Sequence, residues 1–474
     1  MRAFRRTIAT ESTLDAFRAV LPDYDVMLVT ILDAILARFE RHGGRYPFID
    51  TKLNLITGED FGELPDASRD FKGRTAIYSW IQGRGLEALV GHAQWLPECS
   101  VLADAEKSDR AGRLARMIAT VFDAMERIRA KNDGKLFFTM TPDGDAFDMG
   151  ADGRRRVIDI RGSRSRFSDL FYAKGMLAAA AFLGRKDKVE EAKRLFRAVL
   201  ADAEADRFER DAITFDPKNP ARTDAAAGQL PQGPRMIALG GCALFAAVAG
   251  DDEWFEDGAR LLRFLFDHHA NLGRFPDLQP GDFFELRDAE GRPWKEDGAV
   301  RSDPGHSLEF VGLAAKLLLL HVAHPPLGEN PRGEPSGAAA SWPAALCRIF
   351  MRNFRNGFNP RIGGICKHFD LIARRPLNDD LPWWNLPETM RAAAELLVLA
   401  PDAPERADVI DALVRCSNGF MSRFVNPRVH LMAYQMIDAN GKPVDVIPAT
   451  PDADPGYHTG LSLIDMLRAL RRLS

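Results

Sequence analysis

The sequence contains few cysteines, and their spacing matches neither a metal site nor a disulfide framework. Its 474 residues include five cysteines, none of them in a C-x-x-C pair: Cys99, Cys242, Cys347, Cys366 and Cys416. An odd number of scattered cysteines argues against a disulfide scaffold and is typical of reduced thiols in an intracellular protein. We therefore expect free thiols and a cytoplasmic location.

The sequence also lacks a large excess of either charge and a long apolar run. The formal net charge is −4, with 63 basic and 67 acidic residues mixed along the chain. We therefore expect neither nucleic acid nor an anionic membrane as a partner. No uninterrupted apolar stretch reaches the roughly 18 residues of a membrane span. The N-terminal stretch MRAFRRTIATESTLDAF is basic but has no apolar segment, so we expect no signal peptide.

Motifs that bind common cofactors are absent. The sequence has no G-x-G-x-x-G loop after a strand, no G-x-x-x-x-G-K-[ST] and no H-E-x-x-H. His306 and Glu309 would supply two ligands to a metal ion, but no third ligand follows at a characteristic spacing. We expect no metal and no redox cofactor.

Helical periodicity dominates the sequence, with apolar residues recurring three and four positions apart. It predicts about twelve helices, at 24–44, 74–96, 109–131, 167–184, 187–205, 234–250, 252–271, 305–323, about 340–358, 382–400, 404–425 and 456–473. Strand-like runs around Gly, Asp or Pro turns separate alternate helices and predict short β-hairpins. These runs lie at 135–148, 273–293, 363–377 and 430–444.

The recurring unit is a helix pair followed by a hairpin. A helix pair that cannot bury its apolar face alone must stack on its neighbours, and about six pairs can close into a ring. The helices at 167–184, 234–250 and 305–320 are apolar nearly all round, as inner helices would be. We therefore predict an all-α (α/α)6 barrel formed by residues 1–474 as one domain, with 1–23 as an N-terminal extension. An open helical solenoid is the alternative.

Two histidines stand at matching places in this pattern. His306 follows Asp-Pro-Gly and opens an apolar helix, and His458 follows Asp-Pro-Gly-Tyr at the start of the last helix. A helix N-terminus disfavours a cation, so we expect a lowered pKa for His306 and an imidazole that accepts protons. Glu309, three residues on, lies on the same face and would orient that imidazole or bind a hydroxyl. The alternative is ordinary turn and capping chemistry, reused in a repeat protein.

Three further residues are candidates for ligand binding. Arg84 lies between two glycines in a largely apolar helix, and a buried arginine needs an anionic or hydroxylated partner. Trp384 and Glu388 lie four apart on one helix face and offer a stacking plane beside a carboxylate. The alternatives are an ion pair between Arg84 and Glu87 and a purely structural tryptophan cluster.

These residues resemble the N-acylglucosamine 2-epimerase family, which includes cellobiose 2-epimerases, mannose isomerases and sulfoquinovose isomerases. The resemblance rests on a P-G-H-x-x-E motif opening an inner helix, a W-W-x-x-x-E stretch, a C-terminal histidine and an early arginine. The matching residues are Pro304, Gly305, His306, Glu309, Trp383, Trp384, Glu388, His458 and Arg84. Family members often carry Trp three residues after the motif glutamate, where this chain has Gly312, which would leave room at the sugar or remove a stacking plane there.

The resemblance implies an (α/α)6 barrel and a cofactor-independent sugar epimerase or aldose–ketose isomerase. His306 and His458 would exchange protons at C2, or between C1 and C2, of an open-chain sugar, with Glu309 assisting. Arg84, Trp384 and Glu388 would bind the sugar, and the protein would act on a small molecule, as a possible homodimer. Two alternatives remain: a glycoside hydrolase or lyase using Asp303, Glu309 or Glu388, and a non-catalytic sugar-binding ring.

Overall fold

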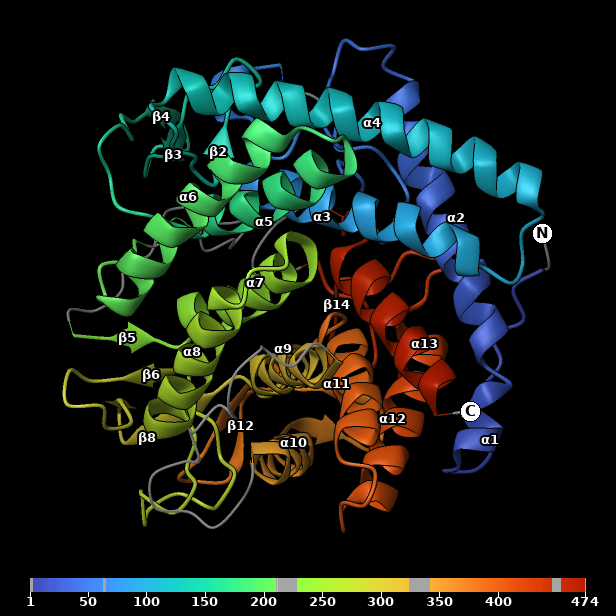
Figure 1. Cartoon of the computed structure of the whole chain (residues 1–474), viewed down its shortest axis with the longest axis vertical. Helices are drawn as coiled ribbons and strands as arrows, with labels where there is room; N and C mark the ends of the chain where they lie inside the picture. Colours follow the sequence, from blue (N-terminus) through green and yellow to red (C-terminus); the bar gives the residue numbers. More distant parts are fainter. Residues whose placement is uncertain are drawn as a thin grey trace.

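The helices form a ring of two layers, as the computed structural model shows for residues 3–62, 65–209, 211, 228–323, 342–445 and 453–473 (Figure 1). The inner layer consists of α3 (Ser79–Trp95), α5 (Phe167–Phe182), α7 (Gly233–Ala249), α9 (Pro304–Ala323), α11 (Asn385–Leu399) and α13 (Ser462–Arg472). The outer layer consists of α2 (Leu21–Glu40), α4 (Asp104–Lys131), α6 (Lys186–Glu204), α8 (Glu253–His269), α10 (Trp342–Gly357) and α12 (Arg406–Gly419). The predicted (α/α)6 barrel is confirmed.

Helix α2 closes the outer layer. The hydroxyl group of Tyr24 on α2 lies 2.8 Å from that of Ser417 on α12. On its other side, Asp33 of α2 accepts hydrogen bonds from Arg110 of α4, with the closer contact at 2.7 Å. The short helix α1 (Leu14–Arg18) precedes it. An N-terminal segment thus joins the last helical pair to the first, and the ring is closed, not an open solenoid.

Small residues let inner helices approach closely. A Cβ atom on Gly175 of α5 would lie 2.3 Å from the carbonyl oxygen of Gly83 on α3. A Cβ on Gly83 would lie 2.8 Å from the backbone of Phe171. Neither position accepts a side chain without moving a backbone, so these glycines set the contact between α3 and α5. This contact brings the first turns of both helices to the same end of the ring.

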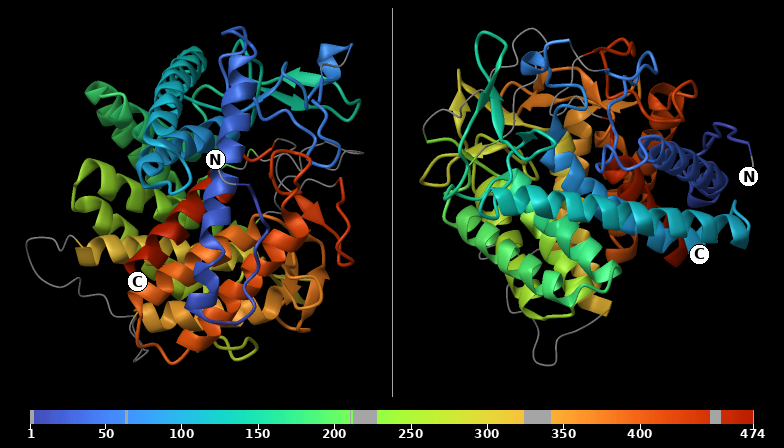
Figure 2. Two further views of the ribbon diagram at one scale, coloured as in Figure 1. Left: turned by 90° about the vertical axis from the view of Figure 1, so that its right-hand side faces the viewer. Right: turned by 90° about the horizontal axis from the view of Figure 1, so that it is seen from above.

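Short strands occupy one face of the ring (Figure 2). The predicted hairpin at 363–377 is confirmed by the antiparallel pair β11 (His368–Asp370) and β12 (Arg375–Asn378). Most strands, however, pair between different connections: β1 (Ile77–Tyr78) with β2 (Thr139–Met140), β5 (Leu230–Pro231) with β6 (Leu286–Arg287), β8 (Ala299–Ser302) with β11, and β13 (Leu381–Pro382) with β14 (Met436–Ile437). The others are β3 (Phe147–Met149), β4 (Arg155–Val157), β7 (Lys295–Glu296), β9 (Phe358–Asn359) and β10 (Gly364–Ile365).

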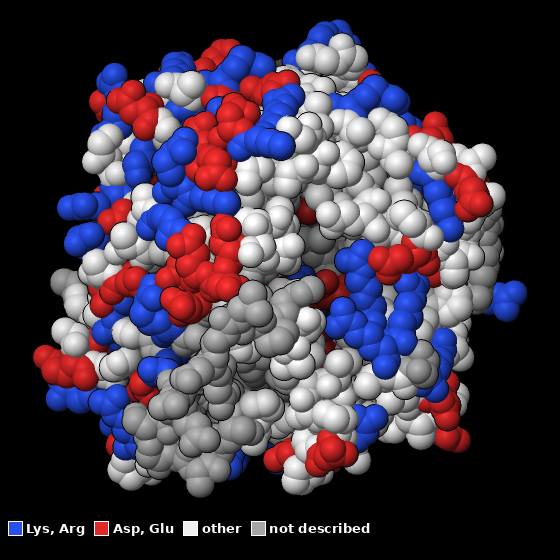
Figure 3. All heavy atoms as spheres, in the orientation of Figure 1, with Lys and Arg blue, Asp and Glu red and all other residues white. Residues whose placement is uncertain are grey.

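One apolar helix, the cysteines and the surface charges bear on expectations drawn from the sequence. Helix α9 is long and apolar enough to span a membrane by composition, but it is a core helix that packs against α7, α10 and α11. All five cysteines are free and buried, as expected. Basic and acidic side chains are interspersed over the face seen in Figure 3.

Candidate functional site

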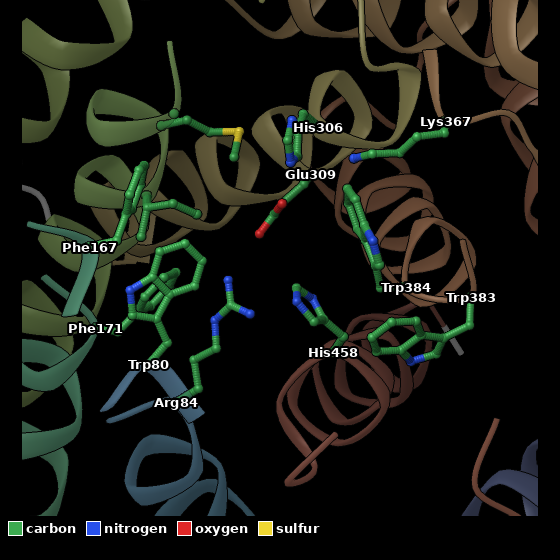
Figure 4. Close-up of a pocket in the computed structure, with 13 residues that line it drawn as sticks. Trp80, Arg84, Phe167, Phe171, His306, Glu309, Lys367, Trp383, Trp384 and His458 are labelled. Carbon is green, nitrogen blue, oxygen red and sulfur yellow. The ribbon is translucent and has the colours of Figure 1, made fainter. Parts of the chain in front are cut away.

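A cavity of about 250 Å³ lies where the inner helices begin. Its lining residues are Trp80, Arg84, Phe167, Phe171, Gly233, Met236, Ile237, His306, Glu309, Lys367, Trp383, Trp384 and His458 (Figure 4). Five of the six residues singled out from the sequence therefore meet here, although they come from α3, α9, the start of α11 and the segment before α13. The sixth, Glu388, lies behind His458.

The two Asp-Pro-Gly sequences act in the same way. Asp303 caps α9, since its Oδ1 atom accepts from the backbone N–H of Gly305 at 3.0 Å and of His306 at 3.3 Å. Asp454 accepts from the backbone N–H of Tyr457 and of Thr459, each at 2.8 Å. A cap of this kind satisfies the free N–H groups of a helical first turn. Each cap places a histidine at the mouth of the ring.

The imidazole of His306 is surrounded by carboxylates. Its Nδ1 atom lies 3.1 Å from Oε2 of Glu285 and 3.5 Å from Oδ2 of Asp303. The Nζ atom of Lys367 lies 2.5 Å from the same Oδ2 atom of Asp303. Glu285, rather than Glu309, thus orients this ring.

The expectation of a lowered pKa for His306 is wrong. Burial alone would lower it, but the negative charges of Asp303 and Glu285 outweigh burial and raise the pKa of His306 to about 9. Burial also opposes ionisation of Asp303, yet His306 and Lys367 lower the pKa of that carboxyl to about 2. The local carboxylates therefore override the helix N-terminus. At neutral pH His306 is an imidazolium.

His458 is held by a different carboxylate. Its Nδ1 atom lies 2.8 Å from Oε1 of Glu388, which also accepts a hydrogen bond from Oγ of Ser462 at 2.7 Å. The other carboxylate oxygen of Glu388 forms an ion pair with Arg391. Burial would raise the pKa of Glu388, but Arg391 and His458 lower it to about 2. Glu388, which the sequence analysis assigns to sugar binding, is fully buried, is not among the lining residues, and contacts His458.

Trp384 lies between the two histidines. Its ring centroid is 5.1 Å from that of His306 and 5.6 Å from that of His458. Trp383 contacts His458 edge-on at 6.1 Å. Both imidazoles consequently lie within reach of one small molecule on the same indole (Figure 4).

Glu309 lines the cavity without a hydrogen bond to another described side chain. One of its oxygens lies within 4.8 Å of ligand atoms of Glu388 and His458. Burial, together with the charge of Glu388, raises the pKa of Glu309. A carboxyl group so placed favours a partner that donates a hydrogen bond, such as a hydroxyl group.

Arg84 also has an open side towards the cavity. Its guanidinium carbon lies 4.0 Å from the ring centre of Phe171, and its buried Nε atom has no hydrogen-bond partner among the residues that the structure describes. Glu87, the alternative partner, instead lies 3.0 Å from Nζ of Lys174. The alternative of an Arg84–Glu87 pair is therefore wrong.

Gly312 does not leave room at the cavity. A Cβ atom there would lie 2.9 Å from Nε of Arg391 and 3.4 Å from the Cα atom of Ala392, both on α11. This glycine permits close packing of α9 on α11 instead of enlarging the ligand site.

Glu309, Glu388 and His458 are near enough to share a metal ion. Glu388, however, already bonds to His458 and Ser462 and pairs with Arg391. A cation would have to displace these contacts beside a guanidinium group, so this donor set fits a metal poorly.

Several residues of the site carried no signal in the sequence. Glu285 lies immediately before β6, in the long connection between α8 and α9, and Lys367 lies between β10 and β11. Arg391 and Ser462 lie within helices whose registers with respect to the cavity depend on packing. Only Asp303 was recognisable, as the aspartate of a turn.

No protein-family model matches the sequence, and no curated protein is detectably similar to it in sequence. Solved structures share its fold. The cellobiose 2-epimerase of Spirochaeta thermophila matches with a TM-score of 0.62 and 14% identity, covering 96% of this chain and 99% of that one. The cellobiose 2-epimerase of Bacillus thermoamylovorans matches with a TM-score of 0.60 and 12% identity, covering 92% of this chain and 100% of that one. A D-mannose isomerase matches with a TM-score of 0.57 and 12% identity, covering 93% of this chain and 97% of that one.

Proposed function

We propose that this protein is a cofactor-independent sugar epimerase or aldose–ketose isomerase that uses His306 and His458 as its acid and base. The observation that carries the proposal is the shared cavity: two imidazoles contact one indole, and a carboxylate holds Nδ1 of each. The fold common to the solved epimerases and isomerase agrees with it. The cavity is smaller than the roughly 300–1,000 Å³ of drug-sized ligand sites, which favours a small sugar.

The carboxylates assign different starting roles to the histidines. An ionised carboxylate only accepts hydrogen bonds, so the Nδ1 atom facing it carries a proton. In His306, whose pKa is about 9, Nε2 is protonated as well, which makes this residue the acid. In His458, Glu388 fixes a proton on Nδ1, so Nε2 is the nitrogen left to act as the base.

The reaction begins at C2 of the open-chain aldose. The C2–H proton passes to Nε2 of His458, and the bonding electrons form C1=C2 while the carbonyl becomes an enolate oxygen. If His306 protonates C2 from the opposite face, the carbonyl re-forms and the product is the 2-epimer. If His306 protonates C1, the proton on O2 passes to O1 and the product is the ketose. Proton exchange with water then resets both histidines.

Three further residues would serve this reaction. The Arg84 guanidinium extends into the cavity in Figure 4 and would stabilise the enolate oxygen by charge-assisted hydrogen bonds. Glu309 would accept a hydrogen bond from a sugar hydroxyl group. Trp384 would stack on the sugar between the two imidazoles.

The two-carboxylate hydrolase is not favoured. Of Asp303, Glu309 and Glu388, only Glu309 lines the cavity. Asp303 and Glu388 are both fully buried. Asp303 forms an ion pair with Lys367, and Glu388 contacts His458. The mechanism of a glycosidase requires two carboxyl groups that face the sugar. Among the described lining residues, Glu309 is the only one that carries a carboxyl group.

Isotope exchange tests the proposal. The protein, shown to be folded by circular dichroism, is incubated in D2O with a panel of aldoses and ketoses and the products are examined by NMR. Starting from an aldose, a 2-epimer with deuterium at C2 identifies an epimerase, and a ketose with deuterium at C1 identifies an isomerase. Absence of exchange with every sugar would refute the proposal. The cytoplasmic location and a homodimeric state remain predictions from the sequence.

A further inference from the structure

The cavity has two chemically different halves. The half that carries the histidines also contains Glu309 and Lys367, whereas α3, α5 and α7 contribute mainly hydrocarbon (Figure 4). The apolar lining residues are Trp80, Phe167, Phe171, Met236 and Ile237. We call these five residues the apolar wall.

The apolar wall offers no hidden polar group to a ligand. The indole N–H of Trp80 is directed away from the cavity and donates to Oδ1 of Asp211 at 3.2 Å. The other four side chains are hydrocarbon or thioether. Among the described lining residues on this side, Arg84 alone carries a hydrogen-bonding side chain.

The apolar wall is also rigid. The Trp80 ring packs edge-on against Phe167, with centroids 5.2 Å apart, and lies 5.6 Å from Phe171. Phe167 packs in turn on Phe208 at 5.0 Å. Met236 and Ile237 are almost fully buried on α7. Rings that are fixed in this way cannot turn aside to admit water to a sugar hydroxyl group.

We infer that the substrate is a sugar whose end remote from C1 and C2 is apolar: a deoxy sugar, or one that carries a small alkyl or acyl substituent. The inference rests on the proposed function, because the histidines must hold C1 and C2 for the other end to reach the apolar wall. A hydroxyl group placed against this wall would lose its hydrogen bonds to water and gain none.

The expected selectivity follows from that loss. An apolar site discriminates against an added hydroxyl group by roughly 10- to 100-fold in kcat/KM. The expected substrates are therefore 6-deoxy sugars rather than their parent hexoses. Arg84 remains available for the oxygen at C1 or C2.

Matched sugars test the inference. The rate of deuterium incorporation is measured in D2O for D-glucose against 6-deoxy-D-glucose and for D-mannose against 6-deoxy-D-mannose. A preference for the deoxy sugars of tenfold or more in kcat/KM is expected. Equal rates, or faster exchange of the parent sugars, would overturn the inference while leaving the proposed function intact.

Binding gives a second readout that does not need turnover. The same four sugars are titrated against tryptophan fluorescence, since Trp80, Trp383 and Trp384 all line the cavity. If no sugar exchanges deuterium, the proposed function fails, and the inference is then judged on affinity alone. Tighter binding of the deoxy sugars supports it and equal or weaker binding overturns it.

A pair of variants at one position locates the effect. Ile237→Thr replaces part of the apolar wall by a hydroxyl group and should reduce the preference for the deoxy sugar at least threefold. Ile237→Val keeps the wall apolar and should retain the preference ratio of the natural chain, whatever its effect on rate. An unchanged ratio in Ile237→Thr, with the fold intact by circular dichroism, would count against the inference.

Discussion

The Nδ1 atom of His458 lies 2.8 Å from Oε1 of Glu388, a carboxylate without exposure to solvent. Because Arg391 and His458 keep this buried carboxyl ionised, with a pKa of about 2, it can only accept a hydrogen bond, and the Nδ1 atom that faces it carries the proton. The contact fixes the imidazole tautomer and leaves Nε2 towards the cavity. Positioning of His458 is thus the role that we assign to Glu388.

Replacing Glu388 by Gln should lower kcat about 10²- to 10⁴-fold with little change in KM. The amide offers an N–H to Nδ1 and favours the tautomer in which Nε2 carries the proton and cannot act as a base. Deuterium exchange at saturating sugar measures kcat. As a control, Ser462→Ala removes only a neutral hydrogen bond to the same carboxylate and should cost about tenfold or less. A Glu388→Gln variant with normal kcat would refute this role.

Replacing either histidine by Asn should lower the rate of product formation at least 10²-fold, because conversion of the sugar needs both proton transfers. Circular dichroism should be unchanged. His430→Asn is the matched control, since His430 is exposed, lies outside the cavity and has a φ of 51°, which asparagine adopts readily. Normal product formation by either His306→Asn or His458→Asn would refute the acid–base pair.

The pH profile should reflect the charge of His306. With a pKa of about 9, this residue is the protonated acid at neutral pH, so kcat/KM should fall as the pH rises through about 9. Asp303→Asn removes a charge that raises this pKa and should move the alkaline limb to lower pH. Rates are measured from pH 6 to 10.5. An alkaline limb that stays in place in Asp303→Asn would contradict the assignment.

Local sequence was sufficient to locate both histidines. Each follows Asp-Pro-Gly, and a capping aspartate acts through residues only two to five positions away. The helices and the ring were likewise predictable, because apolar periodicity over whole helices reports burial. Arg84 stood out because a charged residue interrupts an apolar pattern.

The environment of each histidine was not predictable in the same way. Glu285 contacts His306 from the connection that contains β6. Strands β5 and β6, which hold this connection, are two residues long, and a stretch of two residues is too short to show the alternation that predicts a strand. The expected pKa of His306 was wrong for this reason, since its sign depends on carboxylates whose approach is tertiary. Glu388 was read as a ligand because helical spacing does not reveal which neighbour covers a side chain.

Stability should depend on pH through the same histidine. The folded-state pKa of His306, about 9, exceeds the ordinary value of 6.5. Its contribution to stability is therefore complete below about pH 6.5 and is lost as the pH rises through about 9. The free energy of unfolding is measured by urea denaturation at pH 6 and at pH 9.5. The difference between the two values should be smaller for His306→Asn than for the natural chain. An equal difference in the two proteins would contradict this role of His306 in stability.

Glu309 and Glu285 should respond in opposite directions to the same substitution. Burial and the charge of Glu388 raise the pKa of Glu309, so the ionised form of this carboxyl is less stable in the folded than in the unfolded protein. Glu309→Gln should therefore raise Tm at pH 8 while lowering activity. Burial also opposes ionisation of Glu285, but His306 outweighs it and lowers the pKa, so Glu285→Gln should lower Tm. Thermal unfolding by circular dichroism measures both, and shifts of the same sign would show that the charges of the site are wrongly assigned.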